Sequence, residues 1–145
     1  MGRDSQNTNT LAEHERLFWR LHGAGVMDFQ GRHVAFAHRT FQHLVFRRRG
    51  PHDEDAPPPR RDWQGRILVI PLIGPTLEEP DEVRATEKPD RQIYLRRFAQ
   101  TTCVVVVEGP WRTAGACRFV TAHPCKGRKL RPYRKRRLLH KRHRA

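Results

Sequence analysis

The 145-residue sequence has little of what disulfide frameworks, metal centres or membrane anchors require. Its three cysteines are an odd number without CxxC spacing, and Cys117, His123 and Cys125 at their spacings are only a weak zinc signal. No apolar run approaches the ~20 residues of a membrane span. The opening MGRDSQNTNT also lacks the apolar core of a signal peptide. We therefore expect a cytoplasmic protein, unless a partner exports it.

The motifs of common nucleotide-binding and hydrolytic enzymes are missing as well. The sequence has no GxGxxG, no GxxxxGK[ST], no GxSxG and no HExxH. Its carboxylates cluster at 53–55 and 78–82 without the spacing of a metal site. These absences argue against dinucleotide-dependent enzymes, P-loop enzymes, α/β-hydrolases and zinc proteases.

Positive charge is concentrated at the C-terminus. Residues 126–145 carry 11 of the formal +14 charges and no acid, which leaves a mildly basic body of 125 residues. A like-charge block of this kind is expected to be disordered when free, and it binds phosphate backbones through released counterions. It lacks the apolar face of a membrane-surface helix. The candidate nucleic-acid contacts are Lys126, Arg128, Lys129, Arg131, Arg134, Lys135, Arg136 and Arg137.

The hydrophobic pattern predicts an α+β fold, in which one or two N-terminal helices pack on a small antiparallel sheet of about four strands. Helices are expected at 11–22, at 41–49 with Thr40 as the N-cap, and from Pro71 onward. The 67–70 run could instead be a buried strand. Extended segments are expected at 32–37, 82–86, 93–98, 104–107 and 118–121. The predicted organisation is an N-terminal extension (1–31), one domain (32–125) and a disordered basic tail (126–145).

Several short phrases follow one another in a recognisable order. They are RHVAFAHRTFQHLVFRRRG at 32–50, RILVIPLIGPTLEEPDEVR at 66–84, and then IYLRRF, CVVVVEG and CRFVTAHP. This order, over roughly residues 32–124, resembles the nuclease domains of the barnase–EndoU–colicin–RelE group, especially their phage and mobile-element branch. The resemblance implies a toxin-like ribonuclease that needs no metal and no organic cofactor.

Cleavage of RNA by transesterification needs a base, an acid and cations around the phosphate, roles that histidine and arginine fill at neutral pH. In similar nucleases the first helix reads like HIxxRH, and the match holds at His43 and Arg47, which are spaced i, i+4. Arg48 stands where a second histidine is expected, which leaves the identity of the base open. His43 is otherwise an exposed polar helix position. The resemblance also implies phosphate contacts for Arg47, Arg48 and Arg66, although Arg66 could be a solvated arginine.

Strand alternation adds further candidates. Tyr94 and Arg96 share one face of their strand, so burial of Ile93 and Leu95 would present both on a groove. Thr121 matches a threonine or serine that ends the last strand of similar nucleases, where it would hydrogen-bond a phosphate oxygen beside His123. Each of these residues is equally compatible with an ordinary strand position. Tyr94, Arg96, Thr121 and His43 are therefore the candidate catalytic residues.

Two classes of function remain after these considerations. The first is a metal-independent ribonuclease acting on tRNA, mRNA or ribosomal RNA, with the ribosome and an immunity or antitoxin protein as possible partners. The second is a non-catalytic nucleic-acid-binding or phage structural protein that uses the basic tail; a ribonucleoprotein component is a weaker third. Convergence of His43, Arg96 and Thr121 on one anion site would favour the enzyme.

Overall fold

A single seven-stranded sheet forms the body of the protein in the computed structural model, which describes residues 3–46, 60–99, 101–112 and 115–143. The strand order is β1-β2-β6-β5-β4-β3-β7, and every pairing is antiparallel except that of β2 with β6. The elements are α1 (Arg3–His22), β1 (Val26–Met27), β2 (His33–Ala35), α2 (Thr40–Val45), α3 (Trp63–Leu68), α4 (Ile70–Glu78), β3 (Glu82–Ala85), β4 (Arg91–Phe98), β5 (Thr101–Glu108), β6 (Cys117–Cys125), the 3₁₀ helix η1 (Gly127–Leu130), α5 (Arg131–Arg134) and β7 (Leu138–Lys141).

The predicted combination of helices with a mainly antiparallel sheet is confirmed, but the sheet is larger than the expected four strands. The additional strands are the short β1, β2 and β7, which lie towards the edges of the sheet. Elements of two to four residues are too short for an alternating pattern to reveal them. The extended segment expected at 32–37 does contain β2.

The central strand is β5, as its valine run predicts. Val104 to Val107 are β-branched residues that suit a pleated, buried surface. β5 pairs with β4 on one side and β6 on the other, and Val104, Val105 and Val107 are fully buried. The segments expected to be extended at 82–86 and 93–98 contain β3 and β4, which pair as an antiparallel hairpin with Val83 opposite Tyr94.

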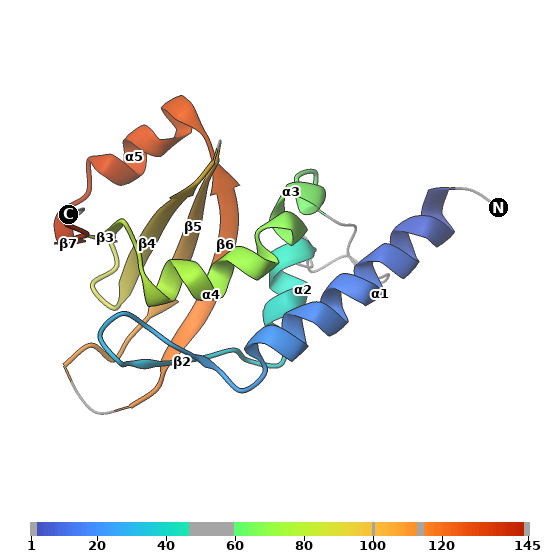
Figure 1. Ribbon diagram of the computed structural model, residues 1–145, viewed down its shortest axis with the longest axis horizontal. Helices are drawn as coiled ribbons and strands as arrows, with labels where there is room; N and C mark the ends of the chain where they lie inside the picture. Colours follow the sequence, from blue (N-terminus) through green and yellow to red (C-terminus); the bar gives the residue numbers. More distant parts are fainter. Residues whose placement is uncertain (1–2, 47–59, 100, 113–114, 144–145) are drawn as a thin grey trace.

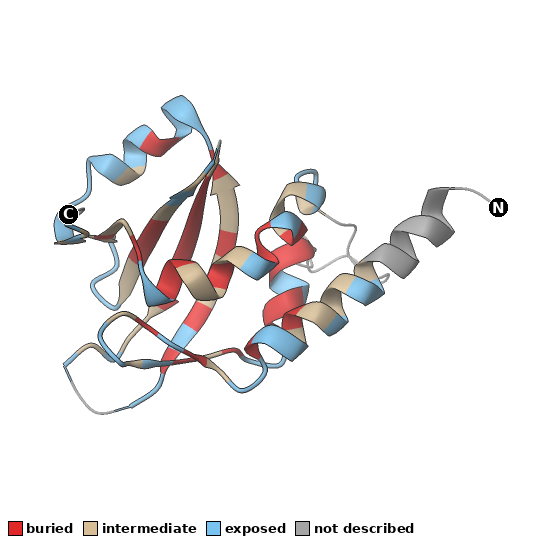
Figure 2. Cartoon of the chain, viewed as in Figure 1, coloured by how far each residue is buried: buried red, intermediate tan, exposed pale blue. Residues whose placement is uncertain are grey.

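Both faces of the sheet are covered. One face, here called the helical face, carries Tyr94 and Val105 and packs against α4, which crosses in front of the strands in Figure 1. The opposite face carries Ile93, Leu95 and Val104, which pack against Leu130 from the C-terminal segment, residues 126–143. We call it the C-terminal face. Figure 2 shows the resulting band of buried residues through the middle strands and α4.

The N-terminal helix is longer than the predicted 11–22 but ends at the expected place. α1 stops at His22, and a Cβ on Gly23 would lie 2.6 Å from the Trp19 carbonyl oxygen, so only glycine fits this close return of the chain. Phe18 is fully buried and meets Phe36 in an edge-to-face contact. α1 is therefore attached to the core by its last turns, while its first turns extend away from the body (Figure 1).

The second helix is shorter than predicted. α2 runs only to Val45, Phe46 is extended, and the Val45 carbonyl accepts a hydrogen bond from the Arg60 N–H at 2.7 Å. Thr40, the expected N-cap, is the first helical residue. Arg47 and Arg48, both predicted to contact phosphate, lie outside the described residues.

The segment of uncertain type before the hairpin is helical. α3 and α4 divide the 67–70 run between them, so the strand alternative is wrong, and Pro71 lies in the first turn of α4 as predicted. A proline is tolerated there because the first N–H groups of a helix have no intrahelical partner. None of the helices in the described ranges is long and apolar enough to cross a membrane.

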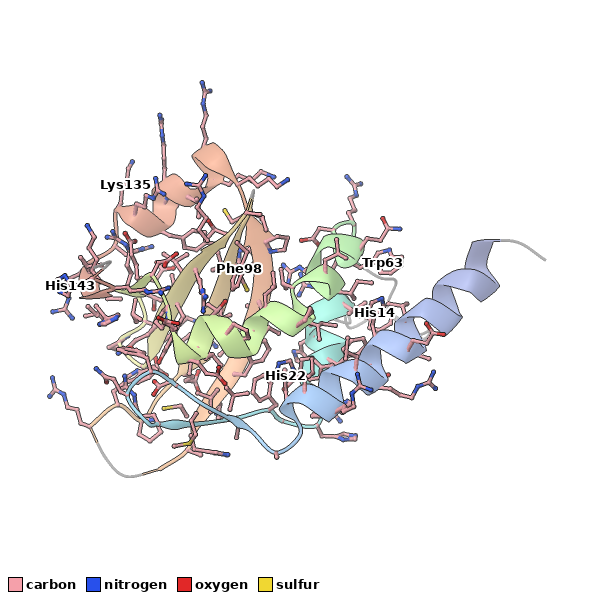
Figure 3. All side chains as sticks on the ribbon, viewed as in Figure 1. His14, His22, Trp63, Phe98, Lys135 and His143 are labelled. Carbon is pink, nitrogen blue, oxygen red and sulfur yellow. The ribbon has the colours of Figure 1, made fainter. Side chains whose placement is uncertain are left out.

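The prediction of a disordered basic tail is wrong for residues 126–143. β7 pairs with β3, Leu130 is only 7% exposed, and the His140 ring lies 4.3 Å from that of Phe29. A few apolar side chains in the segment suffice to cover the C-terminal face, while most of its cations remain in solvent. Figure 3 shows long side chains, among them Lys135 directly after α5, extending outward from this part of the segment.

Candidate functional site

A hydrogen bond joins two of the predicted site residues on the C-terminal face. α3 lies against β6, and the Arg66 guanidinium donates from Nη1 to the Thr121 hydroxyl at 3.2 Å. The same guanidinium donates from Nε to Asp62 Oδ2 at 2.9 Å. Thr121 stands opposite Val106, which packs against the apolar cluster under Leu130. Arg66 is therefore held in one orientation by two partners, with its side chain 14% exposed.

A histidine and a tyrosine lie beside this pair. His123 is two residues after Thr121 in β6, so both project from the same face of the strand. Its Nε2 forms a hydrogen bond of 2.8 Å with the Tyr133 hydroxyl from α5, while its Nδ1 is buried without a partner among the described residues. Burial, together with the nearby Arg66 charge, lowers the pKa of His123 to about 4. The imidazole is thus neutral at pH 7 and can accept a proton.

A second polar group crosses the same face near one end of the strands. Arg91, Glu108 and Arg118 stand in register across β4, β5 and β6. Glu108 accepts from Arg91 Nε at 3.1 Å and from Arg118 Nη2, and these bonds lower the pKa of its carboxyl group. Two arginines share one carboxylate here, so the group keeps a net positive charge.

His43 lies next to these arginines. It is an exposed residue of α2 and lines a hollow of about 210 Å³ together with Arg91 and Arg118. Arg91 also lines a neighbouring hollow of about 330 Å³, whose wall includes Tyr133 and Arg136. A series of cationic and imidazole groups thus follows the C-terminal face from α2 to α5.

Tyr94 and Arg96 are on the other side of the sheet. Tyr94 is 0% exposed, and its hydroxyl donates a hydrogen bond of 2.7 Å to Asp28 Oδ2. The same oxygen accepts a second hydrogen bond, of 3.0 Å, from Arg32 Nε. Burial, and then Asp28, raise the pKa of this hydroxyl. Arg96 donates from Nη1 to the Pro75 carbonyl at 3.0 Å, within α4.

The expectation that these two residues face an open groove is wrong, because α4 covers the helical face. The expected convergence of His43, Arg96 and Thr121 is accordingly not found: Arg96 lies on the opposite face from Thr121. What the structure does bring together is Arg66 with Thr121, and beside them His123.

The three cysteines are buried free thiols. Within the described ranges no group of three or more histidine, cysteine, aspartate or glutamate side chains could hold a metal ion. The polar groups that line the candidate site are imidazole, guanidinium and hydroxyl groups.

The sequence contained a signal for His123 but not for Tyr133. Alternation along β6 places His123 on the face of Thr121, so the pair could have been predicted together. The grouping of Arg91 with Arg118 depends on strand register, which the sequence does not supply. Tyr133 reaches the site only because the C-terminal segment folds back over the sheet.

Comparison with known proteins agrees with the resemblance described above. The family model of phage-Barnase-EndoU-ColicinE5/D-RelE like nuclease2 matches residues 22–141. No curated protein and no solved structure matches the chain. The matched region begins at the last residue of α1 and ends in β7, so it includes the C-terminal segment as well as the central sheet.

Proposed function

The chain belongs to the phage-Barnase-EndoU-ColicinE5/D-RelE like nuclease2 family, and on that premise we propose that it is a metal-independent ribonuclease. The observation that carries the proposal is the Arg66–Thr121 hydrogen bond beside the neutral His123. Together these groups supply a cation, a hydroxyl donor and a proton acceptor at one place on the sheet. These are the functions that cleavage of a phosphodiester requires.

The proposed reaction uses the ribose 2′-hydroxyl as the nucleophile. His123 accepts the 2′-hydroxyl proton, the 2′ oxygen bonds to phosphorus, and the bond from phosphorus to the 5′ oxygen breaks. The leaving 5′ oxygen takes a proton from His43, the exposed imidazole on α2. The products are a 2′,3′-cyclic phosphate and a free 5′-hydroxyl, so atoms and charges balance.

Arg66 and Thr121 act on the phosphate itself. The pentacoordinate phosphorane carries more charge on its equatorial oxygens than the ground state does, and a fixed guanidinium stabilises that charge without reorganising. Asp62 holds Arg66 from the other side, at 2.9 Å. A bound phosphate anion would also raise the pKa of His123 from its value in the free protein, because an opposite charge favours the imidazolium. Proton transfer to His123 therefore becomes more favourable once substrate is present.

The C-terminal segment supplies the general affinity for RNA. Nine of its described arginines and lysines are exposed: Lys126, Arg128, Lys129, Arg131, Arg134, Lys135, Arg136, Arg137 and Lys141. Such side chains displace condensed counterions from a phosphate backbone. A cytoplasmic nuclease of this kind would need restraint in its own host, so an acidic immunity or antitoxin protein is part of the proposal. Tyr94 and Arg96 are not part of the proposed active site, because they lie on the helical face.

One observation favours the non-catalytic alternative. Tyr133 occupies Nε2 of His123, so the imidazole is engaged in the free protein. A protein that only binds RNA would keep this contact, whereas a ribonuclease must release it when substrate arrives.

Incubation with RNA in excess EDTA separates the two functions. We expect cleavage of RNA with 2′,3′-cyclic phosphate ends, and no cleavage of DNA or 2′-O-methyl RNA of the same sequence. His123→Ala and His43→Ala should each lower the rate by roughly 10²–10⁴-fold, while Arg20→Ala, at an exposed position of α1, should not. Binding of RNA without cleavage would establish the non-catalytic alternative. Activity lost on chelation, or shared with DNA, would contradict the proposed mechanism.

A further inference from the structure

A small hollow opens at the other end of the C-terminal face, away from Arg66. It has a volume of about 230 Å³ and lies where β4, β5 and β6 meet the beginning of the C-terminal segment. Its wall includes Arg97, Thr102, Cys125, Lys126 and Arg134. The described residues that line it include no carboxylate. A concave site with three cations and no acid is suited to an anion.

Two separate parts of the fold build this hollow. Arg97, Thr102 and Cys125 form a row of register partners across the three strands. Lys126 follows Cys125 directly, and Arg134 comes from α5. The buried Leu130 fixes α5 against the sheet between them. The positions of the cations are therefore set by the sheet and the core rather than by a flexible chain end.

The three cations have no carboxylate partner within the part of the chain that the structure describes. Eight other arginines do pair with acids, each within 4.0 Å of a carboxylate oxygen: Arg32, Arg66, Arg84, Arg91, Arg96, Arg118, Arg136 and Arg142. None of the ion pairs among described residues includes Arg97, Lys126 or Arg134. Their charge is available to a ligand.

A larger hollow of about 460 Å³ adjoins this one and shares Arg97, Thr102 and Arg134. Its wall also contains Asp81 and Glu82, so it is not selective for anions. Glu82 is paired with Arg84 at 2.9 Å, and Asp81 accepts the backbone N–H of Arg97 at 2.8 Å. The smaller hollow is the part in which positive charge is unopposed.

We propose that this smaller hollow binds a backbone phosphate of the RNA strand at a position remote from the cleaved bond. The choice of RNA as the source of the phosphate rests on the proposed function. Thr102 is four residues from Val106, the partner of Thr121, which places the hollow roughly 13 Å along β5 from the Arg66–Thr121 pair. Both lie on one face, so a single strand of RNA can engage both with different phosphates.

α5 connects the two places directly. Arg134 lines the hollow, and its neighbour Tyr133 contacts His123. An RNA strand long enough to reach the hollow gains a contact that a dinucleotide cannot make. The hollow thus makes binding depend on substrate length, through an interaction that is the same in the ground state and the transition state.

The test compares Arg97→Gln and Thr102→Val with Arg20→Gln, which removes the same charge as Arg97→Gln from an exposed position of α1, outside the hollow and outside the proposed RNA-binding residues. Inorganic phosphate should raise the thermal unfolding temperature of the wild type and of Arg20→Gln, but not of the two hollow variants. Binding of 2′-O-methyl RNA should weaken by about ten-fold in Arg97→Gln, with the slope of log affinity against log salt reduced by about 0.7. Thr102→Val keeps the test valid if Arg97→Gln fails to fold.

Neither measurement requires cleavage, so the outcome is independent of whether the protein is an active ribonuclease. Phosphate stabilisation without any change in RNA affinity would identify free phosphate as the ligand and overturn the RNA assignment. Equal phosphate responses in the hollow variants and in Arg20→Gln would overturn the site itself. If Arg97→Gln cleaves dinucleotides at the wild-type rate but long RNA with a raised KM, the length-dependent contact is established.

Discussion

The Arg66 guanidinium hydrogen-bonds the Thr121 hydroxyl across 55 positions of sequence, and so ties α3 to the middle of β6. The two residues are far apart in the sequence, yet both were predicted to contact phosphate. Their meeting on the C-terminal face defines where substrate phosphate would be held. It also gives the proposed site a fixed cation rather than a mobile surface arginine.

Substitution of Arg66 should therefore affect catalysis more than folding. We expect Arg66→Ala to lower the rate of RNA cleavage by roughly 10²–10³-fold, the usual consequence of removing one fixed donor to a developing anion. Asp62→Asn keeps the guanidinium and removes only its exposed ion-pair partner, and an exposed ion pair contributes about 0–1 kcal/mol. The cleavage rate of Asp62→Asn should therefore fall by less than that of Arg66→Ala. The measurements are steady-state RNA cleavage and urea unfolding of both variants. An Arg66→Ala protein that cleaves RNA at the wild-type rate would show that Arg66 does not contribute to catalysis.

Tyr94 should behave as a structural residue. Its hydroxyl donates to Asp28, whose side chain is fully buried, so Tyr94→Phe removes one donor from a buried carboxylate. We expect the unfolding free energy to fall by about 1.5–3 kcal/mol, the range for hydrogen bonds to charged groups, with the cleavage rate of the folded protein unchanged. Tyr133→Phe removes the hydroxyl that contacts His123 on the C-terminal face, and this substitution should instead change the rate of RNA cleavage. A Tyr94→Phe protein that is as stable as the wild type but does not cleave RNA would show that Tyr94 belongs to the active site.

The fold could be predicted where local chemistry decides it. The valines of β5, the hairpin of β3 and β4 and the end of α1 all follow from residue type and alternation. The orientation of Tyr94 and Arg96 on a common face was also correct. The mistake was to assume that only one face of β4 is buried, because Leu130 and α4 cover opposite faces from segments far away in the sequence.

The candidate site residues, like the fold, could be predicted only in part from the sequence. His43, Arg66 and Thr121 were identified through the resemblance, and alternation could have added His123. The net charge of the C-terminal segment concealed its fold, since a like-charge block is expected to stay open. Its cations point outward, so their repulsion is screened by solvent while Leu130 and β7 pair inward.

The C-terminal segment should prove necessary for stability through Leu130. This side chain is buried against Ile93, Leu95 and Val104, so Leu130→Ala leaves a cavity under α5. We expect a loss of about 2–5 kcal/mol in unfolding free energy. Leu139→Ala, at a position that is 39% exposed, is the matched control and should change stability by less than about 0.5 kcal/mol. Urea unfolding curves that coincide for the two variants would indicate a segment that does not pack on the sheet.

Acid should destabilise the protein through His22. This histidine is 2% exposed, its Nδ1 lies 3.0 Å from the Phe18 carbonyl oxygen, and its ring stacks on Phe36. Burial lowers its pKa from 6.5 to about 4 in the folded protein. Between these values the unfolded chain takes up a proton that the folded chain does not, so stability is complete above pH 6.5 and declines as the pH falls.

The expected slope follows from that difference in bound protons. Between pH 6 and 4.5 the unfolding free energy should fall by about 1.4 kcal/mol per pH unit for each histidine held neutral. Burial also lowers the pKa of His123, so His123 adds to this slope in the same way as His22. In His22→Leu the slope should decrease by about one proton relative to the wild type, because the substituted residue cannot titrate in the unfolded chain. Denaturant unfolding at several pH values measures both slopes. An unaltered slope in His22→Leu would mean that His22 is protonated in the native protein, which the apolar surroundings of Phe18 and Phe36 make unfavourable.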